Sequence, residues 1–222
     1  MRLTDHAYAF PVTIELMDRE MTINPAGVET DDGLLLFDVG IPDGVDDLEA
    51  ALDADGFDLA DVEAVVLTHQ DLDHAGCLAA VVERSDATVY AHEADAPYVE
   101  GEIDLLKSSE ERPMSYDPVP VDVRLVGGET FRTAAGPLDV VYTPGHTPGH
   151  CSLFLREAGL LFAADALNVV DGELVGPRER ATPDMERARE SVGTLADLDV
   201  ASVLCFHGGH VEADAADVAA LQ

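Results

Sequence analysis

The stretch HQDLDH at residues 69–74 places two histidines and two aspartates within six positions. It follows an apolar run, VEAVVL (62–67), with only Thr68 between them. One interpretation is a polar turn between a strand and a helix. The other is half of a metal site, because neutral imidazole and carboxylate groups bind Zn²⁺, iron and manganese. The remaining sequence has to decide between these two interpretations.

Residues of the same types recur where later apolar runs end. VVYTPG is followed by His146, LLFAA by Asp165 and SVLCF by His207. Open α/β folds place their sites at strand ends, where side chains on rigid elements converge. One metal needs three or four protein ligands, so a larger set predicts two metals. Two metals roughly 3.5–4 Å apart can activate a hydroxide and stabilise the oxyanion that it creates. The candidate ligands are His69, Asp71, Asp73, His74, His146, Asp165 and His207.

The spacing within HQDLDH suggests how one short segment serves both metals. In an extended turn, His69, Asp71 and Asp73 share one direction, while His74 begins a new one. We expect Gly76, just inside the following helix, to let this loop pack closely.

Short apolar runs rich in β-branched residues predict the strands that position these groups. We expect GPL (136–138) and REAG (156–159) to form hairpin turns. The predicted strand regions are 12–16, 33–40, 62–69, 87–92, 138–145, 151–165 and 201–208.

Helical patterns lie between these runs, at 45–54, 75–84, 184–195 and 213–221. For the helix at 184–195 we expect Thr182 as the cap and Pro183 at the first helical position. Alternating strands and helices predict an α/β layered protein. A length of 222 residues suits one domain, residues 1–222.

The segment from Glu93 to Asp122 fits no regular pattern. Such a segment is either a lid or binding loop, or an acidic surface excursion. Together with residues 167–182 it is the expected source of the pocket walls, with Tyr98, Tyr116 and Arg178 as candidates. The substrate-binding residues themselves stay unknown at this stage.

The charge of the chain is strongly negative, with 45 Asp plus Glu against 12 Lys plus Arg and a formal net charge of −33. Such self-repulsion is largely screened at about 1 M salt, where the Debye length is roughly 3 Å. The composition therefore resembles that of proteins from halophilic cytoplasms. The sequence has no basic cluster, which argues against nucleic-acid partners.

Three widely spaced cysteines, Cys77, Cys151 and Cys205, form no CxxC pair. They indicate buried thiols rather than a disulfide framework. The first residues carry no apolar signal core, and no apolar run reaches the length of a membrane span. We therefore expect a soluble cytoplasmic protein without membrane partners. The oligomeric state stays open, with a homodimer as one option.

In the order of its motifs, the sequence resembles the metallo-β-lactamase fold superfamily. The residues that carry this resemblance are FDVG (37–40), THQDLDHAG (68–76), TPGHTPGH (143–150), AAD (163–165) and FHGGH (206–210). The TPGHTPGH form is most similar to the glyoxalase II and lactonase-like branches. The resemblance implies a four-layer αββα sandwich, in which two mixed sheets face each other and helices lie outside.

The resemblance also implies roles for the candidate ligands. His69, Asp71 and His146 would hold the first metal. The second metal would have its own set, and Asp165 would bridge the two ions. Asp73 would in addition be the catalytic residue that orients the hydroxide or passes its proton to the leaving group, and Asp38 would support the ligands from behind. The ligands implied for the second metal are Asp73, His74 and His207.

Asp71 departs from the pattern of the family, which usually has HxHxDH where this chain has HxDxDH. A carboxylate there weakens the activation of bound water and favours harder metals. The flavodiiron branch, which binds iron, also has a carboxylate at this place. We expect two divalent metal ions, zinc in the first place, with iron or manganese as the alternatives. The chain ends soon after His207 without the helical domain of glyoxalase II, which argues against a glutathione thioester.

The remaining histidines are assigned lesser roles. We expect His150 to be a structural hydrogen-bonding residue and His6 to lie at the surface. His92 is expected either to end a strand without contact to the site or to support the metal ligands. His210 is expected either to line the mouth of the site or to lie apart from it.

Three functions compete at this point. The leading one is a metal-dependent hydrolase that acts on a small-molecule ester, lactone or thioester. The second is an iron-dependent oxidoreductase on the same fold, acting on oxygen or a sulfur compound, which Asp71 supports. The third is an acidic protein whose metal site has lost its activity, although all seven ligand positions hold competent groups.

Overall fold

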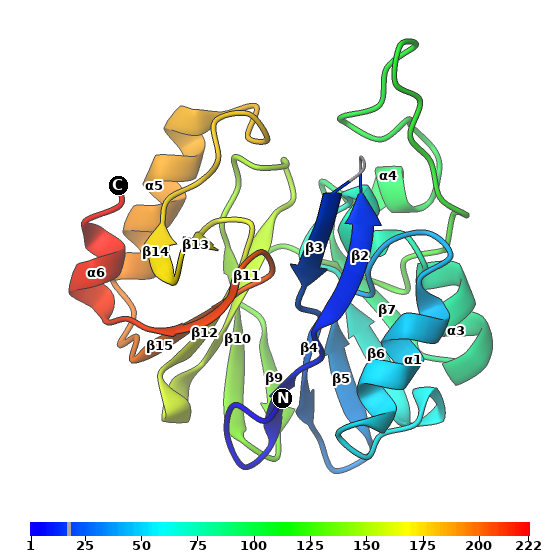
Figure 1. Ribbon diagram of the computed structural model, residues 1–222, viewed down its shortest axis with the longest axis horizontal. Coiled ribbons are helices and arrows are strands. Elements are labelled where there is room, and N and C mark those ends of the chain that lie inside the picture. Colours follow the sequence, from blue (N-terminus) through cyan, green and yellow to red (C-terminus); the bar gives the residue numbers. More distant parts are fainter. Residues whose placement is uncertain (17–18) are drawn as a thin grey trace.

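The computed structural model describes residues 1–16 and 19–222. Within these residues, two six-stranded mixed sheets lie against each other (Figure 1). The first sheet consists, in spatial order, of β1 (Ala7–Ala9), β4 (Ala26–Glu29), β5 (Leu34–Phe37), β6 (Val62–Val66), β7 (Thr88–His92) and β8 (Val123–Leu125). The second consists of β16 (Gly209–Glu212), β15 (Ser202–Cys205), β12 (Leu160–Ala164), β11 (Cys151–Leu155), β10 (Gly136–Tyr142) and β9 (Thr130–Thr133).

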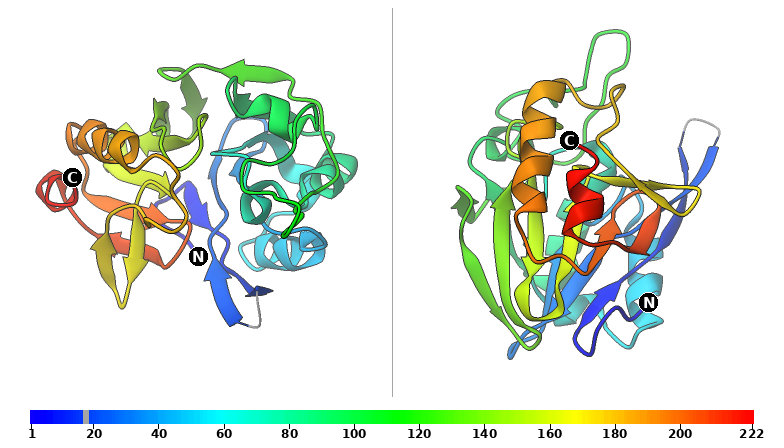
Figure 2. Two further views of the ribbon diagram at one scale, coloured as in Figure 1. Left: turned by 90° about the horizontal axis from the view of Figure 1, so that it is seen from above. Right: turned by 90° about the vertical axis from the view of Figure 1, so that its left-hand side faces the viewer.

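Helices cover the outer face of each sheet. On the first sheet these are α1 (Val45–Asp53) and α3 (Leu78–Ser85), and on the second α5 (Met185–Ala196) and α6 (Ala215–Ala219) (Figures 1 and 2). The shorter elements are α2 (Leu72–Ala75), α4 (Ala96–Val99), the 3₁₀ turns η1 (Leu59–Asp61) and η2 (Arg156–Ala158), and the hairpins β2 (Val12–Leu16) with β3 (Arg19–Ile23) and β13 (Asn168–Val170) with β14 (Glu173–Val175).

The strands owe their continuous apolar character to burial on both faces. In β5, Leu34 and Leu36 pack under α1 and α3, whereas Leu35 and Phe37 point to the opposite face. There Phe37 meets Phe162 of β12 at a ring-centroid distance of 5.0 Å. Alternate residues of one strand thus fill two separate cores. The αββα sandwich that the resemblance implies is confirmed.

The strand directions bring the predicted ligands to one edge. Strands β5 to β8 run parallel to one another, and β12 runs parallel to β15. Since β10 and β12 are both antiparallel to β11, β10 shares the direction of β12. The loops after β6, β10, β12 and β15 therefore leave the two sheets close to one another.

Several expectations about local structure need correction. The helix expected at 75–84 is present as α3 but begins later, at Leu78, and the short helix α2 precedes it. The stretch GPL is not a turn, because Gly136 and Leu138 already pair with β9. The turn at 156–159 is confirmed, with Gly159 at a φ of 61°.

The cap of α5 is also different from the expected one. Asp184 caps this helix by accepting a hydrogen bond from the backbone N–H of Arg187 at 3.0 Å. Asp184 directly precedes the first helical residue, so its carboxylate reaches the first turn. Thr182 lies two residues earlier in the chain and is not the cap. Thr182 is buried and faces the candidate metal centre instead.

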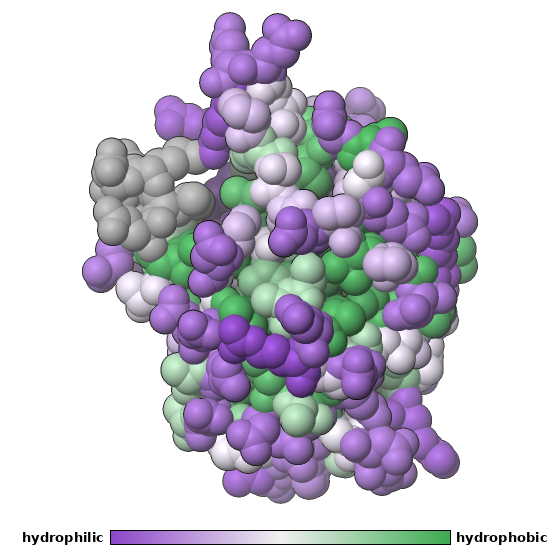
Figure 3. Space-filling view, turned by 90° about the vertical axis from the view of Figure 1, so that its right-hand side faces the viewer, coloured by the Kyte–Doolittle hydropathy of each residue, from purple (hydrophilic) through white to green (hydrophobic). Residues whose placement is uncertain are grey.

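The segment from Glu93 to Asp122 contains α4 and is otherwise irregular, extending beyond the strand ends (Figure 1). The space-filling view of the α1 and α3 side shows hydrophilic residues over much of the surface (Figure 3). Among the helices of the described residues, none combines the length and the apolar character that a membrane crossing requires.

Candidate metal centre

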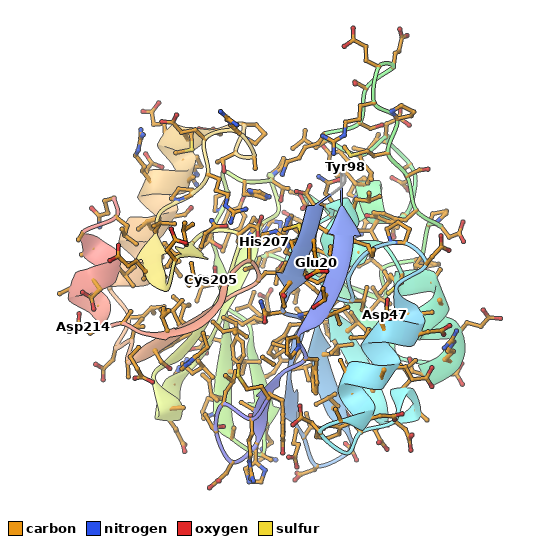
Figure 4. All side chains as sticks on the ribbon, viewed as in Figure 1. Glu20, Asp47, Tyr98, Cys205, His207 and Asp214 are labelled. Atoms are coloured by element: carbon orange, nitrogen blue, oxygen red, sulfur yellow. The ribbon has the colours of Figure 1, made fainter. Side chains whose placement is uncertain are left out.

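The structure brings all seven predicted ligands to the common edge of the two sheets. Their nitrogen and oxygen atoms form three overlapping groups, and within each group these atoms lie within 4.8 Å of one another. The groups are His69, Asp71 and His146; His69, His74 and Asp165; and Asp73, His74 and His207. The first sheet contributes the HQDLDH loop, while the second contributes His146, Asp165 and His207. His207 lies centrally, between the two halves of the molecule (Figure 4).

Asp165 is the residue that joins the two outer groups. Its Oδ2 lies 3.3 Å from His146 Nε2, on the side of the first group. Its Oδ1 lies 3.5 Å from His74 Nε2 and 3.6 Å from His207 Nε2, on the side of the other. The two carboxylate oxygens thus face different groups, an arrangement that would let Asp165 bind to ions in both.

The residues present fit a metal centre. Among the described residues, the buried atoms His69 Nε2, His74 Nε2 and Asp165 Oδ1 have no hydrogen-bond partner, although they lie close together. Leaving buried polar atoms unsatisfied costs about 1–3 kcal/mol each, so native structures avoid it. Imidazole nitrogens and carboxylate oxygens are the donors that divalent transition metals accept. Cations bound in this cluster would satisfy these atoms.

The local path of the chain differs from the extended turn that we expected. The chain enters α2 at Leu72, directly after Asp71, so Asp71 and Asp73 diverge. Asp71 lies near His69 and His146, whereas Asp73 Oδ2 lies 3.2 Å from His207 Nε2. One short segment still serves both outer groups, but through a helical turn rather than through strand alternation.

Gly76 allows the close approach that the sequence suggested. A Cβ atom at this position would lie 2.3 Å from the backbone nitrogen of Pro42 and 2.4 Å from the carbonyl oxygen of Leu72. Both atoms belong to the backbone, so a larger residue would push α2 away from the loop after β5. Gly76 thus permits the close packing of the chain directly after the HQDLDH loop.

Asp38 supports the centre from behind, in the position that the sequence suggested. Its carboxylate accepts a hydrogen bond from the backbone N–H of Thr68 at 2.8 Å and one from the Thr68 hydroxyl at 2.7 Å. Its Oδ2 also lies 2.8 Å from His74 Nδ1, which leaves His74 Nε2 facing the cluster. Burial alone would lower the pKa of His74, but Asp38 and Asp165 outweigh burial and raise this pKa well above its ordinary value. A carboxylate behind an imidazole fixes its orientation and increases its basicity.

The backbone before Asp165 is strained. Ala164 has a φ of 48°, in the left-handed region that residues with a Cβ rarely adopt. The strain coincides with a register irregularity between β12 and β15. The backbone N–H of Asp165 donates to His150 Nε2 at 3.2 Å, which holds the turn. Such strain is found where the surrounding structure must aim one side chain, here the bridging carboxylate.

His150 has the structural role that we expected. Its Nδ1 lies 2.9 Å from the Thr143 hydroxyl, while its Nε2 accepts from the backbone of Asp165. Burial, together with the nearby His146, lowers the pKa of His150 to about 3, so the ring is neutral and can accept this hydrogen bond. Its ring centre lies 5.0 Å from that of His69, behind the ligands rather than among them.

The other lesser predictions concern residues outside the cluster. His92 stacks on Tyr142 at 4.3 Å and accepts from the backbone of Ala94, so its contacts do not reach the ligands. His210 lies half-buried in β16, and His6 is 44% exposed in its side chain. The three cysteines are buried free thiols, as expected.

Asp95 is a supporting residue that the sequence did not reveal. Its carboxylate accepts from the backbone N–H of Gln70 at 3.0 Å, from the Thr147 hydroxyl at 2.7 Å and from the backbone N–H of Gly149 at 2.7 Å. It thereby ties the HQDLDH loop to the TPGHTPGH loop. A Cβ atom on Gly149 would lie 2.7 Å from Asp95, so this glycine is required for the contact. Its place just after a strand that ends in His92 was the available signal.

Lys107 is the second residue that sequence reasoning missed, although it is the only lysine of the chain. Its Nζ forms an ion pair with Asp71 Oδ2 and lies 2.8 Å from His146 Nε2. Its side chain is 25% exposed, so it reaches the cluster from the pocket side. The presence of only one lysine in so acidic a chain could have drawn attention to this residue. The spacing of residues in the sequence, however, does not show that Asp71 is its partner.

Charge around the first group favours the ionised form of Asp71. Burial alone would raise the pKa of this carboxyl, but His69 and His146 hold it well below its ordinary range. The same opposition applies to Asp165, where His207, His146 and His74 outweigh burial and lower the pKa. Burial and the neighbouring His74 lower the pKa of His69, which leaves it neutral. Ionised carboxylates and neutral imidazole are the forms that bind metals.

A pocket of about 180 Å³ opens beside the cluster. Of the three pocket candidates from the sequence, Arg178 lines it, whereas Tyr98 and Tyr116 do not. Tyr116 instead donates to the carbonyl oxygen of Gln70 at 2.9 Å and so braces the HQDLDH loop. The lining residues are Asp71, Leu72, Asp73, Leu105, Lys107, Arg112, Met114, His146, Asp165, Arg178, Ala181 and His207.

Two curated proteins resemble parts of this chain in sequence. The chain is 34% identical over 180 residues to the Bacillus subtilis protein named "Probable metallo-hydrolase YflN". The aligned region covers 69% of this chain and 66% of that protein. It is 32% identical over 129 residues to the hydroxyacylglutathione hydrolase of Jannaschia, covering 58% of this chain and 41% of that enzyme. The alignments thus span slightly less than two thirds of the first relative and less than half of the second.

The chain also resembles a solved structure in its fold and matches the pattern of a protein family. The metallo-beta-lactamase family protein of Thermus thermophilus superposes with a TM-score of 0.76 at 25% identity, covering 99% of this chain and 78% of that one. Residues 24–207 match the pattern of the Metallo-beta-lactamase superfamily. This match includes all seven candidate ligands and most of the 222 residues, so the chain belongs to the metallo-beta-lactamase superfamily.

Proposed function

We propose that this protein is a hydrolase with two metal ions, which cleaves an ester, lactone or thioester of a small molecule. The observation that carries the proposal is the position of Asp165, whose two oxygens face the two outer ligand groups. Membership of the metallo-beta-lactamase superfamily and the cluster of candidate metal ligands both support the conclusion that the protein is an enzyme. The number of ions and the bond that is cleaved are the parts that we infer.

His69, Asp71 and His146 would hold one ion, and Asp73, His74 and His207 the other, with Asp165 between them. When bound, the ions supply Lewis acidity and water activated near neutral pH. The protein holds its imidazoles in the orientation that binding needs, since Asp38 fixes His74. Thr182 does the same for His146, because its hydroxyl lies 3.4 Å from His146 Nδ1.

Asp73 is the residue that we assign to proton transfer. Its side chain is 19% exposed and lines the pocket, so it can reach both the cluster and a bound substrate. The nearby His207 and His74 lower the pKa of this carboxyl against the effect of burial, which keeps it ionised. It would take the proton released by the attacking water and pass it to the leaving oxygen or sulfur.

The relatives support the same reaction class. One is named a probable metallo-hydrolase and another a hydroxyacylglutathione hydrolase. Ester, lactone and thioester cleavage all pass through a tetrahedral oxyanion, so one arrangement of charges serves all three.

The test begins with the metal content per chain, measured by mass spectrometry on protein purified without chelator. We expect two divalent ions, zinc in the first place, and a lowered melting temperature after exhaustive chelation. Hydrolysis of a panel of esters, lactones and thioesters should disappear with the metal and return on reloading. Asp165→Ala and His207→Ala should lose the activity, whereas Asp214→Ala, on the outer surface before α6 (Figure 4), should not. Hydrolysis that persists in fully metal-free protein would refute the proposal.

Asp71 supports a second candidate, an iron-dependent oxidoreductase that acts on oxygen or a sulfur compound. Its carboxylate gives the first group one more negative charge than a third imidazole would, which favours harder ions. This candidate predicts iron in aerobically purified protein and oxygen uptake that depends on substrate. Full activity with zinc alone would exclude it.

The acidic surface supports a working environment of high salt. Asp47 on α1 and Asp214 beside α6 lie on opposite outer sides of the molecule, and both are exposed (Figure 4). We infer a cytoplasmic protein of one domain that is stabilised by added salt. A melting temperature that does not rise with KCl concentration would contradict the salt dependence.

A further inference from the structure

The charges around the pocket have the opposite balance from the rest of the chain. Acidic residues outnumber basic ones by 45 to 12 overall. Among the described residues that line the pocket, however, the acids are Asp71, Asp73 and Asp165, and each is a candidate metal ligand. The other charged lining residues are Lys107, Arg112 and Arg178. The charged lining residues outside the ligand groups are therefore all cationic.

The pocket gathers three cations around one opening. Lys107 is ion-paired there with the candidate ligand Asp71, and Arg178 is exposed at the rim. Several arginines elsewhere on the described surface instead pair with carboxylates outside any ligand group, as Arg84 does with Asp46 and Glu49, and Arg156 with Asp139.

The rest of the lining limits the size and character of the ligand. Leu72, Leu105, Met114 and Ala181 supply the apolar walls, and the volume of about 180 Å³ admits only a small molecule. Apolar walls with a few polar groups are typical of small-molecule sites, in which the polar groups fix the orientation. Guanidinium groups favour carboxylates, with which they form two parallel hydrogen bonds.

We propose that the substrate is a small carboxylate-bearing ester, lactone or thioester, whose carboxylate binds Arg178 and Lys107 at the mouth of the pocket. The inference rests on the proposed function, because it specifies the substrate class of the same site. The scissile carbonyl lies at the ligand cluster, and the short apolar part of the substrate contacts Leu105 and Met114. Contact with these cations at the pocket mouth favours a carboxylate on a surface that is otherwise acidic.

Two probe esters that differ only in charge test this inference. They are 4-acetoxybenzoate and its neutral methyl ester. In both, water adds to the acetyl carbonyl carbon, the bond to the phenolic oxygen breaks, and acetate and a phenol are released. With the metal-loaded wild-type protein at one fixed salt concentration, we expect the carboxylate to have the lower KM. In Arg178→Gln we expect its KM to rise by about tenfold with little change in kcat, because a charge-assisted hydrogen bond is lost. The KM of the methyl ester should not change.

Arg187→Gln is the matched control, because Arg187 lies on α5 and pairs with Glu190 outside the pocket. Its kinetic constants for both esters should equal those of the wild type. A second measurement is independent of catalysis, namely calorimetric binding of benzoate, which should weaken in Arg178→Gln but not in Arg187→Gln. The methyl ester of 4-acetoxybenzoate is then the standard for turnover without a carboxylate.

The outcomes separate this inference from the proposed function. Equal KM values for the two esters, with KM for the carboxylate unchanged in Arg178→Gln, would overturn the carboxylate site while the hydrolase stands. Absence of turnover for both esters and for the wider panel would refute the hydrolase, and unchanged benzoate binding in Arg178→Gln would then overturn the carboxylate site as well.

Discussion

Lys107 Nζ lies 2.8 Å from His146 Nε2, and the same ammonium is ion-paired with Asp71. Both partners belong to the first ligand group, and a metal ion held by them would need the same point in space. An ammonium and a divalent ion repel each other, so they are alternative occupants of this group. A metal ion bound there would therefore displace Lys107 toward the pocket, where we propose that it binds the carboxylate of the substrate.

Removing the ammonium should strengthen metal binding by the first group. In Lys107→Met, we expect the weaker of two zinc-binding steps to tighten by about tenfold, because a charge-assisted contact no longer has to be broken. The tighter step, assigned to Asp73, His74 and His207, should not change. Calorimetric titration of metal-free protein measures both steps, with Arg187→Met as the control cation. Two unchanged steps in Lys107→Met would show that the ammonium and the ion do not compete.

The identity of the metal should depend on Asp71. Replacing it with histidine restores the HxHxDH pattern and exchanges a carboxylate for an imidazole, which zinc accepts readily. We expect Asp71→His to raise the share of zinc over iron and manganese in protein expressed with all three metals. Metal analysis by mass spectrometry gives the ratio. Asp71→Asn, which removes the charge without adding an imidazole, separates the two causes, and an unchanged ratio in Asp71→His would show that this position does not select the metal.

Asp95 should matter for metal affinity although it belongs to no ligand group. It joins the backbones of Gln70 and Gly149, and hence the loops that carry His69 and His146. In Asp95→Ala we expect metal affinity to fall by about tenfold or more, in line with other supporting residues of metal sites. Titration with zinc measures this, and circular dichroism confirms that the variant is folded.

Asp95→Asn keeps one carbonyl acceptor and provides the control for folding. Its affinity should lie between those of the wild type and Asp95→Ala. Zinc affinities that are equal in all three proteins would assign Asp95 a purely structural role.

The three thiols should resist alkylation in the native protein. Burial raises the pKa of Cys77 from 9.0 to about 12, which lowers the reactive thiolate fraction about a thousandfold. Burial also raises the pKa of Cys151 and of Cys205. We expect no adduct after iodoacetamide treatment at pH 8 and three adducts after unfolding, as read by intact mass. Rapid native labelling at any cysteine would show that the region around it opens.

The sequence predicted the gathering of the seven candidate ligands better than the local structure around them. Each of the four segments that carry them follows an apolar run, and a strand end fixes where a side chain points. The strand at Val12–Leu16 and the helix at Val45–Asp53 were also foreseen, since their apolar patterns are regular. Edge strands such as β9 and β16 were missed because half-exposed residues give no clear pattern.

The supporting residues were harder to predict for a physical reason. Asp95 and Lys107 act through contacts with residues 25 to 54 positions away, and no spacing rule records such contacts. Thr182 illustrates the same limit, because its sequence context suggested a helix cap whereas the fold turns it toward His146. Local chemistry is readable from neighbours in the chain, but the choice between two partners is made by tertiary packing.

The ligand groups draw on both sheets, and this has a mechanical consequence. The first sheet holds the HQDLDH loop, and the second holds His146, Asp165 and His207. An ion bound between them acts as a crosslink that neither half can keep on its own. Separation of the two sheets during unfolding would then require release of the ion first. Metal occupancy should therefore determine the lifetime of the folded state as well as its equilibrium stability.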